Sequence, residues 1–158
     1  MRMYQRIGAI GLLLFAVACS TPSQSTTQPA GGTTVATSPA VSLPLSEEDR
    51  AAAPDLTQKF VDAANAGDSA AVAATFAENA RFDSVGRIYP SRKDIMDRFL
   101  DPEVIEAGGK YEVTGTRWNG DRYVVDYKFT TGGGGSEVFY YEFLVRDGLI
   151  QDVIGRYS

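Results

Sequence analysis

The sequence predicts an α+β domain in which three N-terminal helices pack on a strongly curved, mainly antiparallel sheet, giving a cone-shaped α+β barrel. Two observations support this prediction. Apolar residues recur at helical spacing before residue 102, whereas they alternate at every second position between residues 110 and 157. Helices gathered before a run of strands are typical of α+β domains. Residues 46–158 suffice for one hydrophobic core but not for two.

The first helix has two candidate starting points. Ser46 is a possible N-cap followed by acidic residues, and Pro54 suits the first position of the main helix. We expect the main helix to begin at Pro54 and to end at Gly67, which readily adopts the left-handed conformation. Four apolar residues of this segment share one face: Leu56, Phe60, Val61 and Ala64.

Two shorter helices and one short strand are expected next. Asp68 is a candidate cap for a second helix over residues 69–78, and a strand over residues 81–85 follows it. Ser91 caps a third helix, which we expect to end at Asp101–Pro102 because the residue before a proline disfavours helical geometry.

Four strands with period-two alternation complete the domain. Asn119–Gly120 is a strong two-residue hairpin signal, while the glycines of residues 132–135 and the pair Asp147–Gly148 mark the other two turns. The predicted strands cover residues 110–118, 121–130, 136–146 and 149–157.

The N-terminus predicts export and anchoring to a membrane. Residues 1–18 have the features of a signal peptide, with two early arginines and an apolar run too short to span a bilayer. The stretch "FAVAC", which ends at Cys19, resembles the bacterial lipobox, although Ala16 replaces the usual leucine. This resemblance implies cleavage before Cys19, lipidation of its thiol, and a lipid anchor on the extracytoplasmic face of the cell membrane. A tether rich in Ser, Thr and Pro, residues 19–45, then leads to the domain of residues 46–158.

Composition excludes several classes of chemistry. The chain has no histidine and a single cysteine, so Ser-His-Asp catalysis and histidine-containing or thiolate metal sites are excluded from the domain. We expect no metal and no cofactor. The formal charge of −5 argues against nucleic acid as a partner, because phosphate binding needs clustered Lys and Arg.

Two segments resemble the nuclear transport factor 2-like superfamily, which includes SnoaL-like polyketide cyclases and ketosteroid isomerase. They are "FVDAANAGDSAAVAATFAENARFDSVG", residues 60–86, and "EVFYYEFLVRDGLIQDVIGRY", residues 137–157. The resemblance implies a cone-shaped fold. It does not imply one activity, because this superfamily includes enzymes, ligand carriers and interaction modules.

When the active-site residues of ketosteroid isomerase are matched to positions of this sequence, the resemblance implies an incomplete active site. Asp83 takes the position of the general base. Phe60 stands where that enzyme has a tyrosine, and Tyr141 stands where it has a protonated acid. Loss of one oxyanion donor typically costs about 3–4 kcal/mol of transition-state stabilisation, so an efficient steroid isomerase is not expected.

Asp83 therefore has three interpretations. It can be an exposed residue at a strand end, paired with Arg81 or Arg87, or a carboxylate that binds a ligand without catalysis. It can also be a general base acting with Tyr141, which requires that burial raise its pKa.

The aromatic residues of the strands can form either the core or a ligand pocket. Tyr140 and Leu144 lie on the other face of their strand, where family members often form homodimers. The pocket candidates are Phe60, Tyr89, Tyr123, Tyr127, Phe139 and Phe143.

Three functions follow from these alternatives. The leading hypothesis is a membrane-anchored lipoprotein of the cell envelope that binds a small apolar ligand or a partner in an aromatic cone pocket. The second is an isomerase, dehydratase or cyclase that uses Asp83 as its base. The third is an interaction module whose cone is filled by its own side chains.

Overall fold

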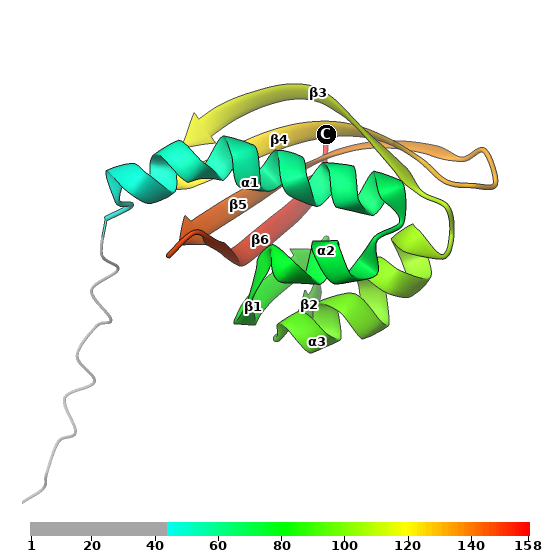
Figure 1. Ribbon diagram of the computed structural model, residues 1–158. Helices are drawn as coiled ribbons and strands as arrows, with labels where there is room; N and C mark the ends of the chain where they lie inside the picture. Colours follow the sequence, from blue (N-terminus) through cyan, green and yellow to red (C-terminus); the bar gives the residue numbers. More distant parts are fainter. Residues whose placement is uncertain (1–43) are drawn as a thin grey trace, which may run out of the picture. The chain divides into compact units, whose positions relative to one another are not determined.

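A computed structural model describes residues 44–158 of the chain (Figure 1). The predicted signal peptide, the candidate lipidation site Cys19 and the predicted tether up to residue 43 lie outside the described residues. Within residues 44–158, no helix combines the length and the apolar character needed to cross a membrane.

Helix α1, Glu47–Ala66, begins well before Pro54, so the predicted start at Pro54 is wrong. Ser46 is the N-cap, and its Oγ accepts a hydrogen bond from the backbone N–H of Asp49 at 3.0 Å. The Asp49 carboxylate in turn accepts one from the backbone N–H of Gly148 at 3.1 Å. These bonds hold the first turns against the domain and offset the hydrogen bond that Pro54 cannot donate inside the helix. Gly67 ends the helix with a φ of 75°, as predicted.

Helix α2, Ser69–Ala74, has the predicted cap, Asp68, but it is shorter than predicted. Residues 76–78 belong instead to strand β1, Phe76–Ser84. The backbone N–H of Ile150 donates to the carbonyl of Thr75 at 2.9 Å, and Phe76 then pairs with Ile150. This long-range pairing overrides the helical tendency of the alanine-rich segment.

A short strand and a continuous helical segment follow β1. Strand β2, Arg87–Tyr89, pairs with β1, and Ser91 caps helix α3, Arg92–Ile95, as predicted. The helix continues as the π-helix η1, Met96–Ile105, so the predicted end at Asp101–Pro102 is wrong. The burial of Phe99, Leu100 and Val104 stabilises this segment and offsets the hydrogen bond that Pro102 cannot donate inside the helix.

The six strands form one mixed sheet in the order β2-β1-β6-β5-β4-β3. The β1–β6 pair is parallel, and all other neighbouring strands are antiparallel. The helices lie on the concave side of this curved sheet (Figure 1), which confirms the predicted fold class. The last four strands are β3 (Lys110–Asn119), β4 (Arg122–Thr130), β5 (Ser136–Arg146) and β6 (Leu149–Tyr157).

The turns between these strands match the predictions with one shift. Asn119 pairs with Arg122, so the two turn residues of the β3–β4 hairpin are Gly120 and Asp121 rather than Asn119 and Gly120. Asp147 and Gly148 form the β5–β6 turn as predicted, with φ values of 54° and 69°. The alternation of β4 and β5 is intact, so the aromatic residues of these two strands keep their predicted faces.

The closed part of the cone is filled by aromatic rings. Phe60 of α1 is fully buried, and its ring centroid lies 5.7 Å from that of Tyr111 and 5.9 Å from that of Phe143. Side chains of both the helices and the sheet therefore share one core. The other large residues with no more than 1% exposure include Phe76, Phe82 and Tyr127.

Candidate functional site

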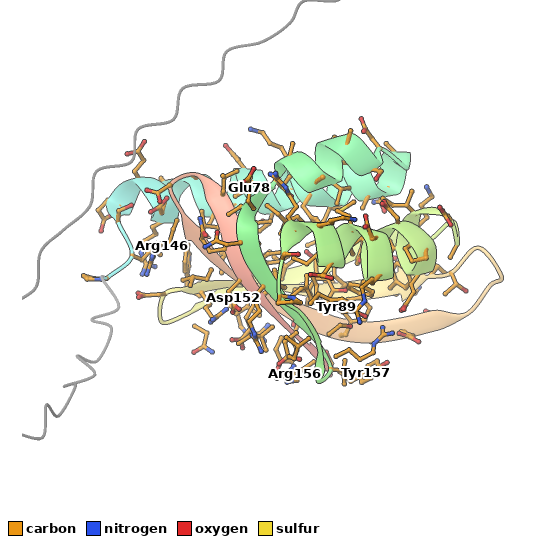
Figure 2. All side chains as sticks on the ribbon, turned by 90° about the horizontal axis from the view of Figure 1, so that it is seen from below. Glu78, Tyr89, Arg146, Asp152, Arg156 and Tyr157 are labelled. Carbon is orange, nitrogen blue, oxygen red and sulfur yellow. The ribbon has the colours of Figure 1, made fainter. Side chains whose placement is uncertain are left out.

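One end of the cone remains open as a cavity of about 210 Å³. It lies between the β1–β2 turn, η1, the loop after β4 and the end of β6. Figure 2 shows Arg156 and Tyr157 close together at this end, whereas Arg146 lies near the start of α1. Six of the fifteen residues that line the cavity are aromatic: Phe99, Tyr111, Phe129, Phe139, Tyr141 and Tyr157.

The structure divides the six predicted pocket residues, together with the candidate catalytic residue Tyr141, into three groups. Tyr141 and Phe139 line the cavity. Phe60, Tyr127 and Phe143 belong to the filled core instead, because their rings are enclosed by other aromatic side chains.

Two further pocket candidates lie elsewhere. Tyr89 is stacked on Phe99, with ring centroids 5.2 Å apart, and does not itself line the cavity. Tyr123 packs against Trp118 at a centroid distance of 5.1 Å, on a small separate recess of about 40 Å³. The aromatic character of Tyr89 and Tyr123 makes them pocket candidates. Whether an aromatic residue lines the cavity depends also on the order of the strands and on the position of the opening, which the sequence does not reveal.

Several residues that line the cavity are not among the six pocket candidates predicted from the sequence. Tyr111 and Phe129 are cross-strand partners on the concave face, with ring centroids 4.8 Å apart. Their pairing could have been found by aligning β3 and β4 outward from their hairpin. The register shift between Val113 and Gly115 hides it, because the shift interrupts the simple alternation.

Two buried phenols meet at the inner end of the cavity. The hydroxyl groups of Tyr111 and Tyr141 lie 3.5 Å apart. Burial raises the pKa of both groups far above the ordinary value for tyrosine, so each remains protonated at physiological pH. Each can donate a hydrogen bond to a ligand, but neither can serve as a base near neutral pH.

The hydroxyl of Tyr127 has no hydrogen-bond partner within residues 44–158. Its ring centroid lies 5.2 Å from that of Tyr111 and 5.3 Å from that of Tyr141. Burial raises the pKa of Tyr127 as well. The core next to the cavity thus contains an unpaired polar group, which is uncommon in a well-packed interior.

Asp83 does not line the cavity. Its carboxylate accepts two hydrogen bonds from Arg156, each 3.0 Å long, and a third from the backbone N–H of Gly86 at 2.7 Å. Arg81 lies farther away, at 3.6 Å, and Arg87 pairs with Glu103 instead. Asp83 is thus a buried, ion-paired residue at the end of β1, with 7% of its surface exposed.

Arg156 holds the pKa of the Asp83 carboxyl below its ordinary value, and the hydrogen bond from Gly86 acts in the same direction. Burial opposes both effects but does not outweigh them. The raised pKa required of a general base is not met, and the carboxylate and the Tyr141 hydroxyl do not share a cavity. Asp83 instead fixes Arg156, which does reach the cavity mouth.

The acidic groups of the domain do not form a metal site. Among residues 44–158, no group of three or more potential ligands (His, Cys, Asp or Glu) is placed to hold a metal ion. The groups that the cavity offers to a ligand include aromatic rings, phenol and aliphatic hydroxyls, and charged groups at its mouth.

A curved sheet with helices on its concave side and an open aromatic end defines the class of nuclear transport factor 2-like cones. Within this class, the chain belongs to the SnoaL-like domain family, which matches residues 57–153. This match confirms the resemblance stated from the two sequence segments. A search of curated proteins gives no significant match.

Solved structures show the same fold at low sequence identity. An NTF2-like protein of unknown function from Mesorhizobium loti is 20% identical with a TM-score of 0.61, covering 73% of this chain and 99% of its own. A candidate polyketide cyclase from Sinorhizobium meliloti is 24% identical with a TM-score of 0.59, covering 65% and 94%. A computationally designed 17-OHP binder is 17% identical with a TM-score of 0.60, covering 68% and 91%.

Proposed function

We propose that the SnoaL-like domain binds a small, mostly apolar molecule in the cavity at the open end of the cone. The observation that carries this proposal is the cavity of about 210 Å³, whose lining includes six aromatic rings. An apolar cavity of about 150 Å³ accepts benzene, and drug-sized pockets have about 300–1,000 Å³. The cavity therefore suits one ring with short substituents.

The other two hypotheses have less support. A general base that acts near neutral pH needs a raised pKa and contact with the substrate, whereas the pKa of Asp83 is lowered and its carboxylate lies outside the cavity. The third hypothesis, an interaction module with a filled cone, does not account for the open cavity that Tyr141 lines. A designed protein with this fold is named as a binder of 17-OHP, which agrees with ligand uptake.

Blocking the cavity should abolish ligand binding without unfolding the domain. Ser84 is half-buried, lines the cavity and makes no side-chain hydrogen bond within the described residues, so Ser84→Trp fills the mouth. We expect neutral aromatic probes such as toluene and naphthalene to raise the melting temperature of the wild type and not that of S84W. A probe present at 100 times its Kd should stabilise the folded wild type by about 2.7 kcal/mol.

The matched control is Ser136→Trp, because Ser136 is exposed and does not line the cavity. S136W should respond to the probes as the wild type does. The proposal fails if no neutral aromatic probe shifts the wild type, or if S84W keeps the full response.

We also propose that Cys19 anchors the protein to the outer face of the cell membrane. The short apolar run that ends at the chain's single cysteine supports this proposal. Stable anchoring takes two lipid signals, and a diacylated cysteine supplies both. We expect the wild type to incorporate labelled palmitate and to sediment with membranes, and Cys19→Ser to do neither. Ser20→Ala is the control, and equal labelling of C19S and the wild type would contradict the proposal.

A further inference from the structure

We infer that the ligand carries a positively charged ammonium group next to its apolar body; this inference rests on the proposed function of the cavity. Three features of the cavity support it. These are walls made of inclined aromatic rings, two guanidinium groups already bound by carboxylates, and one carboxylate at the mouth without a partner.

The aromatic walls surround the cavity from several directions. The rings of Phe139 and Tyr141 lie side by side on β5, with centroids 4.9 Å apart and planes inclined by 33°. The ring of Tyr111 stands across them, at 89° to Phe139 and 60° to Tyr141. Aromatic rings that enclose a site from different sides attract ammonium groups through cation–π interactions.

The two arginines at the cavity would favour an anion only if their charges were free. The guanidinium of Arg156 donates two hydrogen bonds to Asp83, and that of Arg87 donates two to Glu103, at 2.8 and 2.7 Å. Both pairs have the bidentate geometry that is the strongest arrangement for arginine and carboxylate. An anionic ligand would have to compete with a carboxylate that is already in place.

Glu137 is the charge at the mouth that remains unbalanced. It is exposed, lines the cavity and makes no ion pair with any described residue. Of the four charged residues that line the cavity, Arg87 is paired with Glu103 and Arg156 with Asp83, so Glu137 is the one that has no ion-pair partner among the described residues. An ammonium group at the mouth would give Glu137 a cationic partner, while the apolar body of the ligand occupies the aromatic interior.

The test compares three probes of one shape and different charge. They are phenyltrimethylammonium, its neutral isostere tert-butylbenzene, and the anion benzenesulfonate. We expect calorimetric titration to give a Kd for the cation about tenfold lower than for the neutral isostere, with the anion weakest. The preference should decrease as salt increases.

Two variants assign this preference to the proposed groups. Glu137→Gln should weaken binding of the cation about tenfold and leave tert-butylbenzene unchanged. Phe139→Leu keeps an apolar wall without its π-system, so it should reduce the preference for the cation as well. Glu48→Gln is the control for the change in net charge, because Glu48 is exposed on α1 and does not line the cavity.

The outcomes separate this inference from the proposed function. If tert-butylbenzene binds as tightly as the cation, or benzenesulfonate binds most tightly, the cavity takes ligands but the ammonium inference is overturned. An unchanged affinity of E137Q for the cation also overturns it. If none of the three probes binds and the neutral panel fails too, the proposed function itself is wrong.

Discussion

Replacing Gly109 by alanine is expected to destabilise the domain by about 3 kcal/mol and to impair ligand binding. Gly109 is buried between η1 and β3, beside the ring of Phe129, which lines the cavity. A Cβ atom at this position would lie 2.3 Å from Cζ of Phe129 and 3.0 Å from the carbonyl oxygen of Val104. The ring cannot stay in place with such a neighbour, so the cavity wall must move.

Thermal and urea unfolding of Gly109→Ala would measure this effect, with a decrease in Tm of roughly 10–15 °C expected for a domain of this size. Gly133→Ala is a matched control in the loop after β4. Its new Cβ would meet nothing closer than the Thr131 hydroxyl at 4.0 Å, so the change should stay within about 0.5 kcal/mol. A G109A variant as stable as G133A would show that the Phe129 ring moves freely, contrary to our description of the wall.

Replacing Asp83 by asparagine is expected to destabilise the domain by about 2 kcal/mol at pH 7, because the charge of the buried carboxylate is lost and Arg156 loses its counter-charge. Arg156 is partly exposed, with 41% of its side chain accessible, so water limits the loss. The effect also reaches the cavity, since Arg156 loses the group that holds it at the mouth. Unfolding in urea at several pH values would measure the difference between Asp83→Asn and the wild type.

The difference should depend on pH in a defined direction. The pKa of Asp83 is lower in the folded state than its ordinary value of 3.8, so the folded state binds its proton less readily than the unfolded state. Its contribution to stability is complete above about pH 5 and decreases as the pH falls from there through the native pKa. The wild type and D83N should therefore converge in acid.

Asp126→Asn is the control for a more exposed ion pair. Asp126 pairs with Arg117, and their side chains are 30% and 50% exposed, so loss of this pair should destabilise the domain much less than loss of the Asp83 carboxylate. A D83N variant that is as stable as D126N at pH 7 would contradict the structural role assigned to Asp83. A difference from the wild type that grows as the pH falls would contradict the lowered pKa.

Most of the sheet could be predicted from the sequence because its signals are local. Alternation placed the last four strands within one or two residues, and the pair Asp147–Gly148 identified its turn. The prediction was wrong where distant contacts decide the local structure. Pairing with Ile150 converts Phe76 from helix to strand, and the contact between Asp49 and Gly148 lets α1 begin before Pro54.

The candidate site was less predictable, because a cavity depends on which rings leave space unfilled. Phe139 and Phe143 lie on the same face of the same strand, yet Phe139 lines the cavity and Phe143 is enclosed in the core. Alternation gives both residues the same environment. Only the positions of α1 and η1 across the sheet separate them.

The sequence by itself determined the α+β class, the family resemblance and the exclusion of histidine chemistry, because these follow from composition and from periodicity along the chain. The tertiary structure alone decided the role of Asp83. In the stretch "ARFDSVGRIYP", this carboxylate has no visible partner except Arg81 and Arg87. Its main partner, Arg156, lies 73 residues away and meets it because β1 and β6 are adjacent and parallel.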